Sequence, residues 1–267
     1  MKWARLFGIG FLIVVTFACV FANFVAPSYA HQFRDEPEAA PSRQHLLGTD
    51  DLGRDRFARV LYGTRVSLLL APAAALLSSL LAVLIGGTAG FLGGRVERAV
   101  MAATDLFLSL PWLFLLITVR ALLPLNVSPI TSVAITFALL GCLGWAAAAR
   151  VICADARSLA HSDFILLARA SGSSGLRLLW RQVVPNLQPI VFAQFWISIP
   201  VFILTEANLG VLGLGVAEPL PSWGSLLREL QSYSAITGQP WQFVPLILFV
   251  VVVSCFHLVL LEQESPA

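Results

Sequence analysis

The stretch HSDFILLARASGSSGLRLLWRQVVPN, residues 161–186, is the longest interruption by charged and turn-forming residues between two apolar spans in the second half of the chain. Its residues are typical of two short helices. Ser162 and Asp163 are suited to cap a first helix over Phe164–Ser171, because their side-chain oxygens can accept hydrogen bonds from the N–H groups that lack partners at a helix start. Everything else in the chain can be placed by working outward from this stretch.

The second helix of this stretch is marked by its ends and by one apolar face. Gly172 stands where a left-handed residue ends the first helix, Ser173 and Ser174 can cap the second, and Pro185 is expected to stop it. Apolar residues recur along it at the spacing of one helix face: Leu176, Leu179, Trp180 and Val183. Arg177 and Arg181 share another face, so the helix is predicted to be amphipathic.

The first helix is apolar nearly all round, with Arg169 as its only charge after the caps. A helix of this composition should be buried against something. It could be a connector that rests on the membrane surface, or a plug that inserts into a separate protein. Taken alone, the pattern favours the connector.

The composition is that of a membrane protein. Of 267 residues, 58% are hydrophobic and 12% are charged, and the mean hydropathy is +0.83. A soluble domain carries about 25% charged residues. The basic residues form no stripe interleaved with aromatics, so we expect no nucleic-acid partner. The four cysteines, Cys19, Cys142, Cys153 and Cys255, show no CxxC spacing and are expected to be buried packing residues, with neither a disulfide framework nor a metal site.

The chain is not expected to be an enzyme. Lys2 is its only lysine and precedes any glycine-rich turn, so the sequence holds no phosphate-binding P-loop. The four histidines are far apart, and no nucleophile motif is present. We therefore expect no cofactor and no metal in this chain.

Six apolar segments are long enough to cross a bilayer core of about 30 Å. They are Leu6–Ala26, Val66–Leu92, Ala99–Leu123, Ile130–Ala149, Leu187–Thr205 and Phe243–Leu261. The predicted fold class is an all-α membrane protein of six transmembrane helices. Three parts follow: an N-terminal transmembrane helix (1–26), an outer loop with a short amphipathic helix at Asp55–Tyr62 (27–64), and a five-helix core (65–267). The loop 150–186 lies between helices 4 and 5.

The distribution of arginine and lysine chooses the orientation, since short cytoplasmic loops are richer in these residues. With the N-terminus inside, nine basic residues lie on the inner side, and most of the other eight lie in the outer loop, where acidic residues balance them. We therefore expect the N-terminus, loop 150–186 and the C-terminus to be cytoplasmic.

Polar residues inside the predicted spans are candidate pathway residues, because a charge in the membrane usually faces water or a partner. Asp105 lies in the third span, where snorkelling is an equal alternative; for Arg120, near the outer end, snorkelling is favoured. Glu206 and Asn208 are expected to close the fifth helix before a glycine- and proline-rich turn at the outer surface. Stripes of glycine and alanine in the second and fourth spans are expected to allow close helix packing.

Three stretches together resemble one family, the inner-membrane permease subunits of ATP-binding cassette importers for peptides and nickel, in the "C" permease branch. The first is HLLGTDDLGRD, residues 45–55, continuing through Arg59 to Ser67-Leu68; its signature residues are Gly48, Thr49, Asp50, Gly53, Arg54 and Asp55. The second is Leu209–Gly215 with Pro221, Ser222, Trp223 and Gly224. The third is the opening stretch, which is similar to the loop through which such permeases engage their ATPases.

The resemblance favours the plug over the connector. It implies that a separate ATPase subunit receives the first helix, with coupling residues Phe164, Leu166, Leu167, Ala168, Arg169, Gly172 and Pro185. There are departures from the family's pattern. Leu166 and Leu167 replace its glutamate and first alanine, Gln182 replaces its isoleucine, and no charged ending is recognisable after Leu261.

The resemblance also implies partners and a mechanism. A homologous second permease would complete the pathway in the lipid bilayer of the inner membrane, with two ATP-binding subunits inside and a substrate-binding protein outside. ATP-driven movement of the docked helices would alternate access to the pathway. The alternative is a self-sufficient secondary transporter or channel in which Asp105 or Glu206 carries protons. The sequence does not distinguish a dipeptide, an oligopeptide, glutathione or a nickel complex as the substrate.

Overall fold

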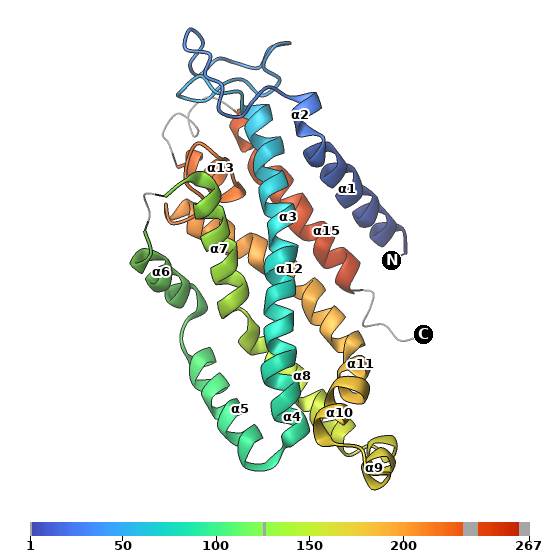
Figure 1. The fold of residues 1–267 in the computed structure, drawn as a ribbon. Coiled ribbons are helices and arrows are strands. Elements are labelled where there is room, and N and C mark those ends of the chain that lie inside the picture. Colours follow the sequence, from blue (N-terminus) through green and yellow to red (C-terminus); the bar gives the residue numbers. More distant parts are fainter. Residues whose placement is uncertain (1, 125–126, 232–239, 262–267) are drawn as a thin grey trace. The chain divides into compact units, whose positions relative to one another are not determined.

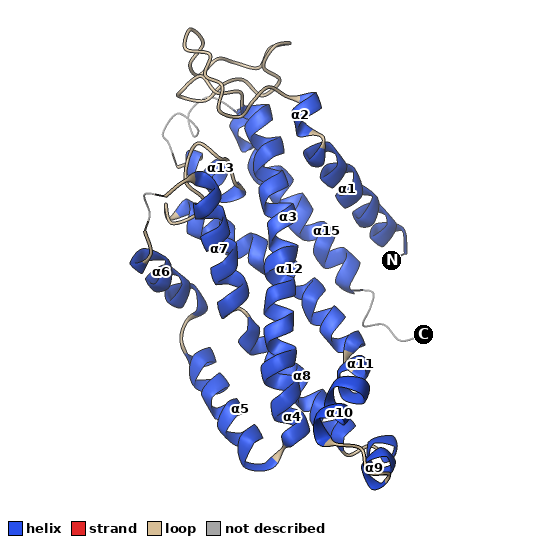
Figure 2. Cartoon of the chain, viewed as in Figure 1, coloured by secondary structure: helices blue, strands red, loops and turns tan. Residues whose placement is uncertain are grey.

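The computed structural model describes residues 2–124, 127–231 and 240–261, and within them the secondary structure is helical, with two isolated β-bridges and no strand (Figures 1 and 2). Five of these helical segments are long and apolar enough to cross a membrane, and a sixth is added if the bent pair α5–α6 counts as one span. The predicted all-α membrane fold is thus confirmed. The predicted departure from the family's pattern after Leu261 falls on residues that lie outside the described part of the chain.

The chain divides into two compact units, and three long helices continue from one into the other. Unit 1 comprises residues 1–71, 120–137 and 200–267; unit 2 comprises residues 72–119 and 138–199. The continuing helices are α3 (Arg56–Ala82), α7 (Pro129–Leu143) and α12 (Gln188–Val211).

Unit 1 brings the two ends of the described chain together. Its further helices are α1 (Lys2–Val20), α2 (Ala22–Val25), α13 (Trp223–Glu229), the 3₁₀-helix η3 (Pro240–Phe243) and α15 (Val244–Leu261). Figure 1 shows α1 beside α15, and the backbones pack closely at Gly8, whose Cβ would lie 3.3 Å from the Cys255 carbonyl oxygen. A small buried cluster of Cys19, Ala22 and Leu61 joins the end of α1 to α3. Cys19, Cys153 and Cys255 are buried, as predicted, but the prediction is wrong for Cys142, which is exposed.

Unit 2 is built around small residues. Its helices are the π-helix η1 (Val83–Gly87), α4 (Thr88–Leu92), α5 (Gly94–Ser109), nearly all of α6 (Trp112–Leu122), α8 (Trp145–Ala160), α9 (Asp163–Ala170), α10 (Gly175–Leu178), the π-helix η2 (Leu179–Val183) and α11 (Val184–Asn186). At Gly86 and Gly90 the backbones of η1 and α4 touch α8 so closely that a Cβ would collide with the carbonyl oxygens of Ala149 and Cys153. The glycine and alanine stripes therefore pack two helices together, as their small size predicts.

Several predicted boundaries are wrong, in each case because a helix continues where local signals suggested an end. The predicted short helix at Asp55–Tyr62 is the beginning of α3, which runs through the expected boundary at residues 64 and 65. The fourth span does not end at Ala149, since α8 continues to Ala160 and takes in the first third of loop 150–186. Likewise α12 continues past Thr205 to Val211.

Proline acts differently at two positions. The predicted third span is broken into α5 and α6, bent by 83° at the segment that contains Pro111. Proline removes a backbone donor and restricts the residue before it, so this break follows from the sequence. Pro185, by contrast, does not stop the second helix, which reaches Asn186. It occupies one of the first positions of α11, directly after the π-helical turn η2, where a missing N–H is tolerated.

Candidate functional site

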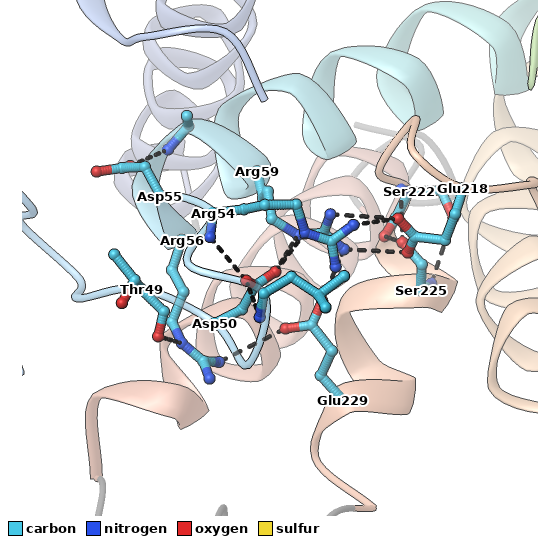
Figure 3. Close-up of polar contacts among 12 residues, drawn as sticks. Thr49, Asp50, Arg54, Asp55, Arg56, Arg59, Glu218, Ser222, Ser225 and Glu229 are labelled. Carbon is cyan, nitrogen blue, oxygen red and sulfur yellow. Dashed lines mark hydrogen bonds and ion pairs between the residues drawn. The ribbon is translucent and has the colours of Figure 1, made fainter. Parts of the chain in front are cut away.

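Buried charges gather where the start of α3, the loop before it and the chain around α13 meet, all within unit 1 (Figure 3). Arg59 is fully buried, and its Nη2 donates to Glu229 Oε1 at 2.7 Å and to Glu218 Oε1 at 3.2 Å. Arg54 donates from Nη1 to Glu218 Oε2 at 2.7 Å and from Nε to Asp50 Oδ2 at 2.6 Å. We call Asp50, Arg54, Arg59, Glu218 and Glu229 the charge cluster.

The loop that supplies Asp50 and Arg54 is held by its own side chains. Asp50 Oδ1 accepts hydrogen bonds from the backbone N–H groups of Leu52 and Arg54, at 2.9 and 2.8 Å. Gly53 has φ of +71°, and a side chain there would also collide with the Phe33 carbonyl oxygen. An aspartate whose side chain accepts hydrogen bonds from the backbone N–H groups that follow it forms a local turn. This turn places Arg54 so that its side chain enters the charge cluster.

Three further signature residues fix this loop to α3 and to the segment before it. Asp55 Oδ1 accepts from Ala58 N at 2.8 Å, which caps α3, while its Oδ2 lies 2.8 Å from His45 Nδ1. Thr49 Oγ1 bridges a carbonyl and an N–H of the preceding segment, and Gly48 has φ of +69°. Every residue of the first signature thus has a structural task in one loop.

The second signature shapes α13, which carries Glu229. Ser222 Oγ accepts from Ser225 N, and Ser225 Oγ accepts from Ser222 N, so the two serines form a capping box at the start of the helix. Trp223 is buried with its ring 4.8 Å from that of Phe249. Gly224 lies against the backbone of Gly210, where a Cβ would be 2.6 Å from the Gly210 Cα. Pro221, which is also buried, precedes the cap.

The two acids of the cluster that come from the second half of the chain have opposite pKa shifts. Burial opposes ionisation of Glu218, but hydrogen bonds and the positive charges of Arg59 and Arg54 outweigh it and lower its pKa. Burial raises the pKa of Glu229, and the nearby charges of Arg59 and Arg56 only partly counteract it. Of the two glutamates, Glu218 is therefore the one whose anion the arginines stabilise more effectively.

The predicted pathway residues lie in different environments. Glu206 is fully buried within unit 1, and Ser67 Oγ donates to its Oε2 at 3.1 Å. Asn208, two residues later on α12, is exposed. Asp105, in unit 2, is about half exposed and forms an ion pair with Arg150, with 3.1 Å between Oδ1 and Nη1. A pathway role for these residues stays a prediction, but two of them already have partners within the chain.

The prediction that Arg120 snorkels is wrong. It is 1% exposed and donates from Nη1 to the Pro124 carbonyl oxygen and from Nη2 to Ser132 Oγ. Ser132 Oγ in turn donates to the Gly215 carbonyl oxygen and accepts from Ala217 N. Arg120 and Ser132 therefore tie the glycine-rich turn to the start of α7, a task that no sequence signal indicated.

Most of the predicted coupling residues lie on α9 or directly after it, whereas Pro185 lies in α11, and most of them are exposed. Ile165 is fully buried in the apolar core of unit 2 and anchors the helix. Phe164, Leu166 and Leu167 are 43%, 47% and 69% exposed. Ala168 packs against the core, and Arg169 lies over the Phe91 ring at 5.7 Å. Pro185, the last of the predicted coupling residues, is exposed.

The predicted ends of α9 are right in position and wrong in one detail. Gly172 has φ of +81°, and its N–H and that of Ser173 donate to the carbonyl oxygens of Arg169 and Ala168, as in a glycine-terminated helix. Ser162 occupies the N-cap position, but its hydroxyl donates back to the Leu159 carbonyl oxygen instead of capping α9.

Comparison with known proteins identifies the family. Residues 82–262 match the model of the binding-protein-dependent transport system inner membrane component. The chain belongs to this family. It is 33% identical over 231 residues to the oligopeptide transport system permease protein OppC of Bacillus subtilis, covering 86% of this chain and 72% of the relative. It is also 33% identical over 234 residues to the di/tripeptide transport system permease protein DppC of Pseudomonas aeruginosa, covering 85% and 75%.

Family membership makes the chain a multi-pass transport permease that is not itself catalytic, as the missing P-loop predicted. The match to the family model starts at residue 82. It therefore omits the first signature and includes α9 and the second signature. The charge cluster joins a loop outside the matched segment to a helix inside it.

Proposed function

We propose that this chain is one of two permease subunits of an ATP-driven peptide importer, and that α9 is the helix through which a separate ATPase subunit moves it. The observation that carries the proposal is the exposure of three large apolar side chains on a helix that is anchored from its other side. Exposed apolar residues in contiguous positions are typical of a surface that binds a partner. Peptides are proposed as substrates because similar permeases are named for oligopeptides and dipeptides.

The orientation belongs to this proposal. We propose that the N-terminus, α9 and the C-terminus are cytoplasmic and that residues 27–55 lie outside, where a substrate-binding protein would dock. In a background with the four native cysteines replaced, a cysteine at the exposed Ser174 should be labelled only from the cytoplasmic side. A cysteine at the exposed Ser42 should be labelled only from outside. Labelling of both from one side would overturn the topology.

Docking of α9 can be tested at Leu166, which is 47% exposed and stands where the family's pattern has glutamate. Burying a leucine side chain stabilises a complex by about 1.5–3 kcal/mol, so Leu166→Ala should weaken retention of the ATPase. Leu166→Glu should be tolerated better than Leu166→Lys, because the helix N-terminus favours a negative charge. Co-purification of the ATPase with each variant is the measurement.

The matched control is Leu80→Ala, which removes a similarly exposed leucine (54%) from a different helix, α3. All four variants should insert normally, and Leu80→Ala should retain the ATPase as the wild type does. Wild-type retention across the three Leu166 variants would place this residue outside the interface and remove the main support for coupling through α9.

A further inference from the structure

A polar cavity of about 300 Å³ lies beside the charge cluster, within unit 1. Its lining comes from the loop before α3, the glycine-rich turn after α12, and α13. Three glycines line one wall, Gly210 in the last turn of α12 and Gly213 and Gly215 in the turn after it, and none of them has a side chain to fill the space. A cavity of this volume is at the small end of the range of about 300–1,000 Å³ seen for small-molecule sites.

The charged residues around the cavity fall into two groups. Arg54, Glu218 and Glu229 are engaged with one another through the charge cluster. Asp51 and Arg228 also line the cavity, are exposed, and have no ion pair or side-chain hydrogen bond among the described residues. Within the described part of the chain, the cavity thus presents one anion and one cation that have no charged partner and do not pair with each other.

The Arg228 side chain lies against one glycine of the cavity wall. Its guanidinium lies against Gly213, so that a Cβ at Gly213 would be 3.0 Å from Nη1 and 3.3 Å from Cζ. Gly213 has φ of +78°, a conformation that glycine adopts readily. The glycine therefore both makes the turn and leaves room for the arginine. A guanidinium is well suited to bind a carboxylate with two parallel hydrogen bonds.

We infer that this cavity is a binding site for a small zwitterionic peptide, with the peptide carboxylate on Arg228 and its ammonium group on Asp51. The glycine wall fits such a ligand, because glycines have no side chains with which to select among peptide side chains. The inference rests on the proposed function and deepens it, since it places a peptide-binding site within this chain itself, separate from the substrate-binding protein.

The test pairs changes in the protein with changes in the ligand. The complete importer is placed in nanodiscs without its binding protein, and binding of Ala-Ala, N-acetyl-Ala-Ala and Ala-Ala-amide is followed by saturation-transfer NMR over a concentration series. Arg228→Gln should weaken Ala-Ala at least tenfold and leave the binding of Ala-Ala-amide unchanged. Asp51→Asn should weaken Ala-Ala similarly and leave the binding of N-acetyl-Ala-Ala unchanged.

Asp35→Asn and Arg43→Gln are the matched controls, because both residues are exposed in the same loop region and neither lines the cavity. They should bind all three ligands as the wild type does. Equal losses for free and blocked peptides, or no binding of Ala-Ala to the wild type, would overturn the site. So would variants that bind Ala-Ala normally but no longer retain the binding protein, since the cavity would then be a socket for that protein.

ATP-dependent peptide uptake, measured on the same preparations with the binding protein added, separates this inference from the function on which it rests. Normal wild-type uptake without the predicted pattern of losses contradicts the site alone. Absence of peptide uptake by an assembled, ATP-hydrolysing complex contradicts the proposed substrate class.

Discussion

The interior of unit 1 and the interior of unit 2 are stabilised by different kinds of contact. In unit 1, residues far apart in the chain meet through buried charges: Arg59 and Glu229, 170 positions apart, are joined by a hydrogen bond of 2.7 Å. In unit 2, η1, α4 and α8 meet through glycines and alanines whose backbones touch. Ion pairs specify an arrangement because each charge needs a partner of opposite sign in the right direction. Small residues specify an arrangement because only they allow two helix backbones to touch. The two units should therefore fail in different ways when single residues are changed.

The largest effect is expected from Arg59→Met in unit 1. Removing this fully buried cation leaves three carboxylates, from Asp50, Glu218 and Glu229, close together with less compensation. Breaking a buried charge network in this way costs about 3–5 kcal/mol. Thermal unfolding of the detergent-solubilised chain should show a large decrease in stability relative to the wild type. Arg43→Met, at an exposed position, should change stability by less than about 0.5 kcal/mol.

A smaller loss is expected from Gly86→Ala in unit 2. The added Cβ would lie 2.9 Å from the Ala149 Cα, which belongs to the backbone and cannot rotate away. Overpacking of this kind costs about 1–3 kcal/mol. Gly10→Ala is the control, because no atom lies within 4 Å of its Cβ position. If both substitutions had the same effect on unfolding, close packing would not be what holds unit 2.

The smallest effect concerns pH and the two glutamates of the charge cluster. The folded-state pKa of Glu218 is below its ordinary value of 4.5, so its contribution is present above pH 4.5 and is lost as the pH falls through the folded-state pKa. Glu218→Gln should cost up to about 1 kcal/mol at neutral pH, because this side chain is half exposed, and the difference from wild type should vanish in acid.

Glu229 should show the opposite sign. Its folded-state pKa is raised, so its contribution to stability is present below pH 4.5 and decreases as the pH rises through the folded-state value. Unfolding measured against pH for Glu218→Gln and Glu229→Gln should therefore give differences from wild type that change in opposite directions. Parallel pH profiles would mean that the two acids do not share the arginines as the structure indicates.

The sequence predicted most of the membrane fold and little of the charge cluster. Long apolar runs identify spans because a helix must be long and apolar to cross a bilayer, and the break at Pro111 is readable in hindsight from proline chemistry. The stripes around Gly86 predicted close packing directly. Boundaries such as that at Ala149 were wrong, because helices continue past the apolar core wherever tertiary contacts support them.

The charge cluster could not be predicted because its partners are distant in the sequence. Both signatures were singled out, but Glu218 lies between the two parts of the second one and Glu229 follows it, and nothing local pairs these glutamates with Arg54 and Arg59. Arg120 shows the same limit. An arginine near a span end is compatible with snorkelling, and only the fold brings Ser132 to it. The one feature of the sequence that indicates such a cluster is the excess of acidic residues and arginines in a chain that is otherwise apolar.

The most direct test of the functional account is substrate uptake by the purified complex in proteoliposomes. With the partner permease, the ATPase subunits and the binding protein present, we predict peptide uptake that requires ATP on the side of α9 and peptide-loaded binding protein on the other. Uptake driven by a proton gradient, by this chain alone and without ATP, would contradict the account and would return Asp105 and Glu206 to the role of proton carriers.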